Sequence, residues 1–492
     1  MKWENIYISG VNAKLLDNKA MENGISEYAL MSNAAGMIYN ALISSNVSAK
    51  SIAIVCGIGN NGGDGFALAN LLWDQGYNPR VIYYDSPRGE NSKRFFCDFI
   101  EKKGFVLKFS ENRELAANII TDSTIVIDAL FGFSFGGQLT GDCLTLAELI
   151  NSGDGYVISV DLPSGVYADG GFAFGCICAD LTCTFTVNKA STCSYPSLEY
   201  CGTVALCDIG VPVSAMNGIK PDGFIITDEI FSCLSARTPN SNKGTYGTLL
   251  ALCGSINMTG SAYLAAIGAL RSGVGLLKMT SDRETLAVLK NRLSEPVFVP
   301  FIRDILCEEK YTALLVGCGI GRNYDNLLDE ILTHQKQITI IDADGINYIA
   351  SHINVLTEMQ GDVILTPHPG EMARLIGQSV DYVNSNRIEC AKAFAMEFGC
   401  VLVLKGNHTI IASPNGSVFI SPSGNTSLSK GGSGDVLAGV ISSLAAQGIS
   451  PTKAACLGAY VHGLAAENLS KKYGIRGLLP HDLPQEIGRI LG

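Results

Sequence analysis

Hydrophobic positions recur along this chain in two alternating patterns. Continuous apolar runs at residues 51–56, 124–127 and 156–160 are typical of strands buried on both faces of a parallel sheet. Stretches with apolar residues at helical spacing lie between them, as in residues 66–75, and residues 14–42 predict two helices joined near Gly24. This alternation predicts an α/β protein built on doubly wound parallel sheets.

The pattern breaks once and then resumes. Periodicity fades over residues 213–238, after which residues 248–253 and 401–404 predict buried strands and residues 261–271 predict a helix rich in small side chains. Asn415-Gly416, between two short strands, predicts a β-hairpin. Because 492 residues exceed one ordinary core, we expect two domains, a Rossmann-like three-layer α/β/α domain over 1–215 and a second α/β domain over 232–492.

Composition and charge disfavour several classes of partner and binding site. The net charge of −11 argues against nucleic-acid or membrane-surface partners, which favour basic patches. The first ten residues lack a basic segment followed by an apolar run, and no stretch approaches a membrane span, so we expect a cytoplasmic protein. The 16 cysteines are scattered without a zinc-like pair, which favours reduced core thiols over a metal site.

A glycine-rich segment, residues 57–65, follows the first predicted strand directly. Gly57, Gly59 and Gly62 fit the dinucleotide-binding pattern Gly-x-Gly-x-x-Gly, a weak match by itself. Asn60 and Asp64 add side-chain oxygens that such a turn does not need, although these residues also form turns. We expect a loop that binds a phosphate-bearing ligand, followed by a helix from residue 66.

Oxygen-bearing side chains follow three strands of the first half. Asn61, Asp128 and Asp161 come at strand ends, with Ser164 just beyond. Each could cap the next helix, but together they predict a shared ligand and cation site, because such strand ends meet in one crevice. All six histidines lie after residue 330, and hard oxygen ligands suit an alkali or alkaline-earth cation better than zinc.

Four motifs of the first half resemble NAD(P)H-hydrate epimerases over about residues 10–212: LMSNAAG (30–36), GNNGGDG (59–65), DALFG (128–132) and VDLPSG (160–165). The resemblance implies that Asp161 is the catalytic acid/base. It also implies a potassium ion held by Asn61, Asp128 and Ser164. The substrate contacts that it implies are Asn60, Asn61, Gly62, Gly63, Asp64, Gly132, Phe133, Ser134, Phe135, Gly136, Gly137, Gln138 and Asp161.

A second glycine-rich segment, residues 429–439, precedes a predicted helix. Gly431, Gly432 and Gly434 allow a tight turn, so the exposed N–H groups of the helix start would seat a phosphate. Asp435 falls in the first turn, where it is either a stabilising charge worth roughly 0.3 to 1 kcal/mol or a base for phosphoryl transfer. The chain contains no Walker phosphate-binding loop.

Further strand ends of the second half carry polar motifs at residues 317–321, 342–345 and 366–371. Each could be only a turn with a helix cap. His368, however, lies between two prolines in a stiff segment, and we expect it to face a ligand. Lys405 follows a buried strand and precedes a glycine, so we expect it in a nucleotide-phosphate pocket rather than in solvent.

Six motifs in order resemble the ADP-dependent NAD(P)H-hydrate dehydratases of the ribokinase-like superfamily over residues 232–492: KG (243–244), GCG (317–319), DADG (342–345), PHPGE (367–371), LKG (404–406) and GGSGD (431–435). The resemblance implies a ribokinase-like domain with hydrate contacts from Ala262, Gly319, His368 and the catalytic Asp435. It implies nucleotide contacts from Lys405, Gly406, Asn407, His408, Thr409 and Gly434.

The two halves together resemble bifunctional NAD(P)H-hydrate repair enzymes. The resemblance implies that the chain epimerises R and S hydrates of NADH and NADPH and dehydrates the S form, with ADP as phosphoryl donor giving AMP and phosphate. It implies Mg²⁺ and a potassium ion as cofactors. Small residues in 261–273 and in the N-terminal helices favour a homo-oligomer.

Two other functions fit parts of the pattern. A small-molecule kinase of the ribokinase superfamily, fused to a dinucleotide-binding module, would use Asp435 for the same proton transfer. An NAD-dependent dehydrogenase is disfavoured, because we find no His or Lys base at a suitable strand end after the first glycine-rich segment.

Overall fold

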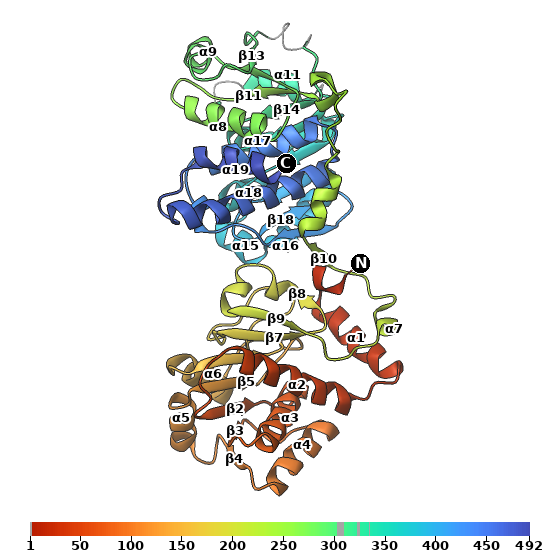
Figure 1. The fold of residues 1–492 in the computed structure, drawn as a ribbon, viewed down its shortest axis with the longest axis vertical. Coiled ribbons are helices and arrows are strands. Elements are labelled where there is room, and N and C mark those ends of the chain that lie inside the picture. Colours follow the sequence, from red (N-terminus) through yellow and green to blue (C-terminus); the bar gives the residue numbers. More distant parts are fainter. Residues whose placement is uncertain (1, 303–308, 322–324, 334) are drawn as a thin grey trace. The chain divides into compact units, whose positions relative to one another are not determined.

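The computed structural model describes residues 2–302, 309–321, 325–333 and 335–492. The chain forms two compact units, Met1–Gly223 and Phe224–Gly492, coloured red to yellow and green to blue in Figure 1. Each unit has its own predominantly parallel sheet with helices packed on it. The predicted two-domain α/β class is therefore confirmed.

The first unit is built on a seven-stranded sheet of order β4-β3-β2-β5-β6-β7-β9, with every pair parallel. Its strands are β2 (Ile52–Cys56), β3 (Arg80–Tyr83), β4 (Phe105–Lys108), β5 (Ile125–Ala129), β6 (Tyr156–Val160), β7 (Leu181–Phe185) and β9 (Thr203–Cys207). Outside this sheet, β1 (Ile6–Ile8) pairs in parallel with β8 (Asn188–Lys189). Its helices are α1 (Gly10–Glu22), α2 (Glu27–Ser44), α3 (Asn60–Asp74), α4 (Glu90–Glu101), α5 (Arg113–Thr121), α6 (Gly141–Ser152) and α7 (Val213–Met216).

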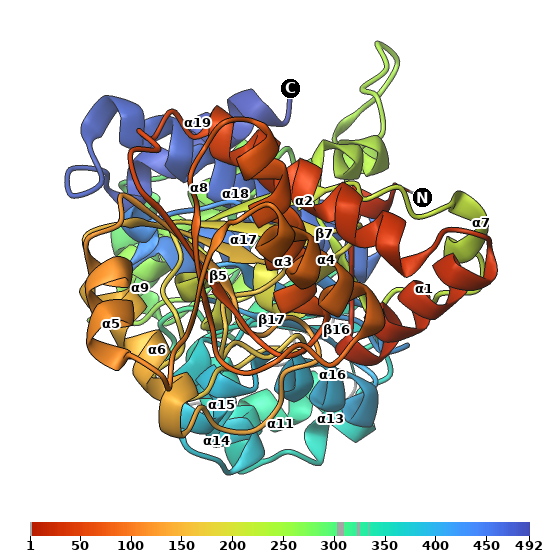
Figure 2. The same ribbon diagram turned by 90° about the horizontal axis from the view of Figure 1, so that it is seen from below.

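Helices cover both faces of this sheet. Figure 2 shows α2, α3 and α4 on one side and α5 and α6 on the other. The alternation of side chains along β2 supplies both layers: Ile54 packs in the core with Phe66 of α3, whereas Val55 packs in the opposite core with Ile120 of α5. Burial on both faces explains why the strands are continuously apolar in sequence.

The second unit has a sheet of order β13-β12-β11-β14-β15-β16-β17-β18-β19-β10. Only β18 runs antiparallel to its neighbours, forming with β19 the predicted hairpin. Its strands are β10 (Gly223–Ile225), β11 (Thr248–Leu252), β12 (Leu276–Thr280), β13 (Val297–Phe298), β14 (Ala313–Val316), β15 (Ile338–Ile341), β16 (Val363–Leu365), β17 (Val401–Leu404), β18 (Thr409–Ala412) and β19 (Val418–Ser421). The pairing of β10 with β19 places part of the segment 213–238, which has no sequence periodicity, in a sheet.

The helices of the second unit are α8 (Thr259–Arg271), α9 (Arg283–Lys290), α11 (Asp325–Thr333), α12 (Asp344–Ser351), α13 (Val355–Glu358), α14 (Pro369–Ile376), α15 (Val380–Ser385), α16 (Arg387–Phe398), α17 (Ser433–Ala446), α18 (Pro451–Tyr473) and α19 (Leu483–Ile490). Helices α8 and α17 approach backbone to backbone. A Cβ atom at Gly439 would lie 2.1 Å from the carbonyl oxygen of Ala265, and one at Gly268 would lie 2.7 Å from that of Val436. The small residues of α8 are thus used within the chain, and they give no support to self-association.

The predicted start of the helix after the first glycine-rich segment is wrong. Helix α3 begins at Asn60 and not at residue 66, so the glycine-rich segment is largely helical. Its glycines serve close packing, because a Cβ atom at Gly62 would lie 2.0 Å from the carbonyl oxygen of Gly57, and one at Gly65 would lie 2.7 Å from Cβ of Ala129. Asn60, Gly62 and Gly65 therefore occupy the first turns of a helix that lies tightly against the sheet.

Two expectations from composition can be compared with the fold. Every cysteine that the structure describes is a free thiol, and among the six in residues 176–207 only Cys178 is exposed, which agrees with core thiols. None of the helices in the described part of the chain combines the length and the apolar character that crossing a bilayer requires.

Candidate functional site

A cavity of about 320 Å³ lies in the first unit, where strands β2, β5 and β6 end. Eight of the predicted substrate residues line it: Asn60, Asn61, Asp64, Gly132, Phe133, Ser134, Phe135 and Asp161. Five do not. Gly62 and Gly63 are buried within α3, and Gly136, Gly137 and Gln138 are exposed beyond the cavity wall. The cavity is thus lined by the start of α3, the residues directly after β5 and Asp161.

Asp161 is the most constrained group of the cavity. It is buried and has a φ of 65°, a left-handed conformation that costs a residue with a side chain roughly 1 to 3 kcal/mol. Its Oδ1 accepts from Nζ of Lys189 at 2.6 Å, and its Oδ2 accepts from the backbone N–H of Phe133 at 2.9 Å. Lys189 Nζ also donates to Thr184 Oγ1 and to the carbonyl oxygen of Phe185, both at 3.1 Å.

Three further carboxyl groups, Asp17, Asp64 and Glu27, line the same cavity. Burial raises the pKa of Asp17 to about 6; Asp161 and Glu27 also raise it, and Lys189 partly opposes them. Burial, followed by the charges of Asp161 and Asp17, raises the pKa of Asp64 well above its ordinary value. The cavity therefore places two carboxyl groups with raised pKa values, Asp17 and Asp64, near the Asp161–Lys189 pair, an arrangement suited to acid and base catalysis.

The two asparagines of α3 differ in their contacts. Nδ2 of Asn60 donates to Glu27 at 2.8 Å, and the other carboxylate oxygen of Glu27 accepts from Asn91 at 2.6 Å. Nδ2 of Asn61 is buried without a hydrogen-bond partner. Because a buried amide is normally paired, the orphaned donor of Asn61 indicates a position for an acceptor of a bound ligand.

Asp128 and Ser164, two of the three predicted potassium ligands, lie together. Ser164 donates to Asp128 Oδ1 through Oγ at 2.6 Å and to Oδ2 through its backbone N–H at 2.8 Å, and Ser159 Oγ donates to Oδ2 at 2.9 Å. Burial raises the pKa of Asp128, and these hydrogen bonds oppose the shift. Asn61, the third predicted ligand, forms no hydrogen bond to Asp128 or Ser164 in the described part of the chain.

These donors fit an alkali cation by their chemistry. A carboxylate oxygen of Asp128 and the hydroxyl oxygen of Ser164 are hard ligands, and Ser164 Oγ lies 3.2 Å from the carbonyl oxygen of Phe131. Such a ligand set excludes neither sodium nor potassium and is poor for zinc. The potassium site stays a prediction.

In the second unit, α17 begins where the sequence predicts. Gly432 is the N-cap, with a φ of 102°, and Asp435 lies in the first turn. Burial raises the pKa of Asp435 to about 6, and the charge of Asp342 adds to this shift. One ligand atom each from Cys318, Asp342 and Asp435 lies within 4.8 Å of the others. A carboxyl group that titrates near neutrality at a helix N-terminus is well placed to accept a proton.

Lys405 joins this cluster from the end of β17. Its Nζ lies 2.7 Å from Asp342 Oδ1 and 3.8 Å from Glu371 Oε2. Burial alone would lower the pKa of Lys405, but Asp342 and Glu371 outweigh it and the pKa is raised, so the ammonium group stays charged. A Cβ atom at Gly434 would lie 3.4 Å from this Nζ, which places the cation at the start of the helix that carries Asp435.

His368 has a clear structural role as the N-cap of α14. Its Nδ1 accepts from the backbone N–H groups of Gly370 at 3.0 Å and Glu371 at 3.3 Å, while Glu371 Oε2 accepts from the backbone N–H of His368 at 2.8 Å. Burial, Lys405 and Arg374 lower the pKa of the ring. The helix-cap alternative is thus right, and since 49% of the side chain is exposed, contact with a ligand stays a prediction.

Ala262 and Gly319 lie beside the Asp435 cluster. A Cβ atom at Gly319 would be 2.8 Å from Cβ of Ser261, and a hydrogen bond from Ser261 lowers the pKa of Asp435 against the effect of burial. Ala262 is fully buried and packs near Gly254, so contact of this residue with a ligand stays a prediction.

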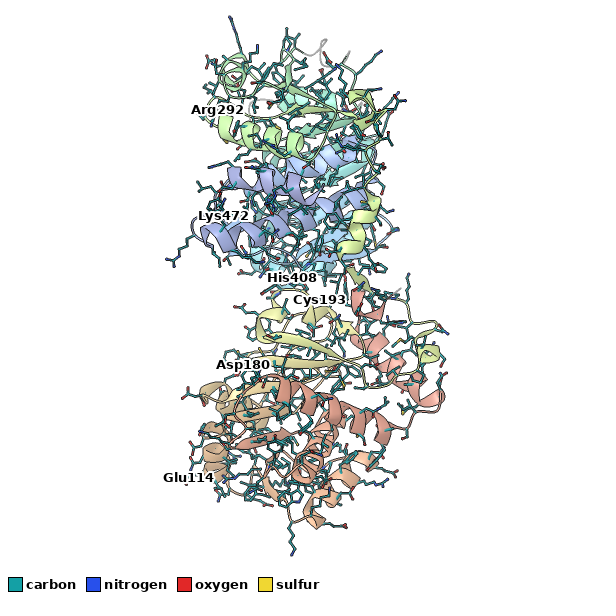
Figure 3. The ribbon with its side chains drawn as sticks, in the orientation of Figure 1. Glu114, Asp180, Cys193, Arg292, His408 and Lys472 are labelled. Carbon is teal, nitrogen blue, oxygen red and sulfur yellow. The ribbon has the colours of Figure 1, made fainter. Side chains whose placement is uncertain are left out.

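The predicted nucleotide contacts Lys405, Gly406, Asn407, His408 and Thr409 form the turn from β17 to β18. Gly406 and Asn407 are exposed, and His408 has a φ of 51°. His408, labelled in Figure 3, lies at the end of the second unit where Figure 1 labels α15 and α16.

Several groups were not predicted from the sequence. Lys189 is the clearest, because it pairs with Asp161, whereas the sequence showed no His or Lys base at a suitable strand end after the first glycine-rich segment. It belongs to the two-residue strand β8, which has no periodicity to mark it. Asp17 and Glu27 come from helices outside the glycine-rich motifs, and Arg387 lies at the start of α16. Asp342, in contrast, could be predicted as a site residue from the sequence, because it directly follows a buried strand.

Comparison with protein families divides the chain at the same two regions. Residues 249–489 match the family described as NAD(P)H-hydrate dehydratase, and residues 27–191 match the family described as YjeF-related protein N-terminus. A solved ribokinase-like superfamily protein from Enterococcus faecalis is 25% identical, with a TM-score of 0.50, over 54% of this chain and 94% of that one. An ADP/ATP-dependent NAD(P)H-hydrate dehydratase from Bacillus subtilis, co-crystallized with ATP/Mg2+, is 34% identical, with a TM-score of 0.49, over 54% of this chain and 96% of that one.

Whole-chain relatives extend this similarity across both units. A bifunctional NAD(P)H-hydrate repair enzyme from Moorella thermoacetica is 34% identical over 483 residues, which is 93% of this chain and 91% of that protein. Enzymes of the same name from Coxiella burnetii and Escherichia coli are 31% and 29% identical, over 95% of this chain and 96% and 90% of theirs. The chain therefore belongs to the family of bifunctional NAD(P)H-hydrate repair enzymes.

Proposed function

We propose that the chain repairs hydrated NADH and NADPH. The first unit interconverts the R and S hydrates, and the second unit dehydrates the S form with ADP, giving AMP and phosphate. The observation that carries the second activity is the position of Asp435, with its pKa of about 6, at the start of α17 next to the ammonium group of Lys405. Membership of the family supports both activities.

The second site has the parts that phosphoryl transfer needs. The hydrate carries a hydroxyl on the carbon beside the ring nitrogen, and hydroxide is a poor leaving group. Asp435 accepts the hydroxyl proton while the oxygen forms a bond to the terminal phosphorus of ADP and AMP departs. The N–H groups at the start of α17 and the charge of Lys405 stabilise the phosphoryl group. The ring nitrogen then expels phosphate, and a proton lost from the neighbouring ring carbon restores the dihydronicotinamide.

The carboxylates of this site fit a magnesium ion. Mg²⁺ is held in proteins by one or two carboxylates together with waters and substrate phosphates. Asp342 would supply such an oxygen beside the base Asp435, whereas the Cys318 thiol, which lies near both, is a poor ligand for it. Bound Mg²⁺ supplies neutralisation of the charge on the phosphates.

In the first unit, Asp161 is the proton carrier. The neighbouring Lys189 holds its carboxylate in place and balances its charge within the buried cavity. The orphaned amide of Asn61 offers a donor to the bound hydrate. A potassium ion at Asp128 and Ser164 would fix the geometry of the loops that follow β5 and β6.

The cellular setting is also part of the proposal. A net charge of −11 and buried free thiols support a cytoplasmic protein without nucleic-acid or membrane partners. The homo-oligomer rests on the small residues of the N-terminal helices alone, since those of α8 pack against α17.

The test uses a mixture of R and S NADH hydrates with ADP and Mg²⁺. Recovery is measured by the near-ultraviolet absorbance of the restored dihydronicotinamide. Wild type recovers the whole mixture, Asp161→Asn recovers the S portion rapidly and the rest only at the spontaneous epimerisation rate, and Asp435→Asn recovers nothing while still exchanging the epimers. Each variant is the control for the other. No recovery by wild type with ADP or ATP contradicts the proposal, and a stable phosphorylated product identifies the alternative, a ribokinase-like kinase.

A further inference from the structure

Arg387 is a buried cation that the proposed chemistry does not use. It is the first residue of α16, and its side chain is 6% exposed. No carboxylate lies within ion-pair distance of it among the residues that the structure describes, and burial lowers the pKa of its guanidinium to about 10. A positive charge at a helix N-terminus also opposes the helix dipole. The burial of this charge and its position at a helix N-terminus are both unfavourable, which indicates that Arg387 has a role other than stabilising α16.

The guanidinium directs its donors at the backbone of one turn, the segment between β17 and β18. Nη1 donates to the carbonyl oxygen of Asn407 at 2.7 Å. Nη2 donates to the carbonyl oxygens of Leu404 and His408, both at 3.4 Å. One carbonyl group at the end of β17 and two carbonyl groups of the turn are thus gathered around one side chain, as a planar fork of donors allows.

The conformation of the turn depends on this side chain. A Cβ atom at Gly406 would lie 2.6 Å from Nη2 of Arg387, so the backbone passes closer to the guanidinium than another residue could. His408 has a φ of 51°, which a residue with a side chain adopts only when its surroundings impose it. Thr409 Oγ1 closes the turn by donating to the carbonyl oxygen of Gly406 at 3.0 Å.

The start of the turn adjoins the second site. Lys405 leads into the turn, with its backbone N–H on the carbonyl oxygen of Pro367 at 2.8 Å and its Nζ on Asp342 at 2.7 Å. In a trans peptide the N–H points opposite to the carbonyl group. The carbonyl groups of Asn407 and His408 point at Arg387, and therefore the N–H groups of His408 and Thr409 point away from it.

We propose that Arg387 is a positioning residue for the nucleotide: by holding the carbonyl groups of Leu404, Asn407 and His408 it fixes the turn that binds ADP. Its guanidinium contacts backbone carbonyl groups, so it acts through the geometry of the backbone. The proposal rests on the proposed function for its ligand, and on the hydrogen bonds of Arg387 for its mechanism.

The first experiment compares Arg387→Met and Arg387→Lys with Lys392→Met, which removes another cation of α16. Hydrogen bonds of a buried charged group predict a rise in KM for ADP on the order of tenfold to a hundredfold in Arg387→Met. We expect a smaller rise in Arg387→Lys, because an ammonium group reaches fewer carbonyls, and none in Lys392→Met. The KM for the hydrate and the epimerisation rate of the first unit stay at wild-type values. Equal rises in KM for ADP and hydrate, or no rise for ADP, would overturn the proposal.

The second experiment measures ADP and AMP binding to the full chain by calorimetry, without turnover. Positioning predicts the same fold loss of affinity for both nucleotides in Arg387→Met, because the turn itself is displaced. A loss that grows with the phosphate charge would show direct attraction and would contradict positioning. If wild type binds ADP in an Arg387-dependent way but restores no dihydronicotinamide, the proposed function fails while the role of Arg387 stands. Thermal unfolding of each variant shows that the second unit is folded.

Discussion

Nζ of Lys189 lies 2.6 Å from Oδ1 of Asp161, and both side chains are almost fully buried. The two residues come from different strand ends, and their pairing puts a balanced charge pair inside a cavity that also holds Asp17, Asp64 and Glu27. Removing one partner of such a pair leaves a buried charge uncompensated, which is far more costly than the loss of a surface pair.

Replacing Lys189 with Met therefore tests the first site directly. We expect epimer exchange to fall at least about a hundredfold and the first unit to lose about 3 to 5 kcal/mol of unfolding free energy, as for other broken buried pairs. Dehydration of the S hydrate by the second unit stays unchanged. The matched control is Lys108→Met, which removes a surface lysine paired with Asp85. Epimer exchange is measured by chromatography. A wild-type exchange rate in Lys189→Met would exclude a catalytic role for the pair.

Substitution of Gly132 tests whether the close approach of Asn61 and Asp161 is needed for epimerisation. A Cβ atom there would lie 2.9 Å from Asn61 Oδ1 and 3.1 Å from Asp161 Oδ2. We expect Gly132→Ala to displace both groups and lower epimerisation at least about tenfold, since small misplacements of catalytic groups have effects of this size or larger. Gly136→Ala, where no atom lies within 4 Å of the added Cβ, is the control and keeps its rate. Equal losses in the two variants would show that the effect comes from the loop backbone.

The pH dependence of dehydration reports the titration of Asp435. Because the pKa of this carboxyl group is raised to about 6 in the free protein, kcat/KM for dehydration falls as the pH drops below that value. Initial rates between pH 5 and 8, with epimerisation measured in parallel, check this profile. A rate that is constant down to about pH 4.5 would mean that the base has an ordinary carboxylate pKa and is not Asp435 in this state.

The same raised pKa has a consequence for stability. The folded state binds the proton of Asp435 more tightly than the unfolded chain, so ionisation above pH 6 opposes folding, and the penalty disappears below the unfolded pKa near 4. The difference between the folded and unfolded pKa values corresponds to at most about 3 kcal/mol. We expect Asp435→Asn to stabilise the second unit at pH 7.5 and to give no such gain near pH 4. Urea unfolding at the two pH values measures this difference, and a destabilised variant at pH 7.5 contradicts it.

The packing of α8 against α17 makes a separate prediction. Gly439→Ala introduces a Cβ atom 2.1 Å from the carbonyl oxygen of Ala265, so α17 must move and carry Asp435 with it. We expect a loss of about 1 to 3 kcal/mol in stability, as for other overpacked cores, together with slower dehydration. Gly260→Ala, with open space around its Cβ, is the control within α8. Unchanged unfolding of Gly439→Ala would show that the two helices separate without cost.

Removal of potassium tests the cation site of the first unit. We expect epimerisation to fall when potassium is replaced by lithium, because the smaller ion cannot span the oxygen ligands, and dehydration to persist. Ser164→Ala removes the hydroxyl group that contacts Asp128 at 2.6 Å, and its rate no longer responds to potassium. Epimerisation that is equal in potassium, sodium and lithium would remove the cation from the proposal.

The sequence by itself determined the elements that depend on local pattern. Buried strands at 52–56 and 401–404 are continuously apolar, and these apolar runs marked them. Gly432 with Asp435 marked the start of α17, because backbone freedom and first-turn charge are local properties. Order and spacing of motifs were sufficient to indicate the family. The exception was α3, whose early turns contain glycines that disfavour a helix until the sheet packs against them.

Only the tertiary structure decided which side chains meet. Lys189 reaches Asp161, Lys405 lies beside the start of α17, and Arg387 holds a turn that follows it by about twenty residues. These contacts depend on strand order, on the depth at which a side chain is buried and on the direction of its donors. None of these leaves a periodic trace in the sequence, because a single lysine or arginine has the same local signature in a core as on a surface.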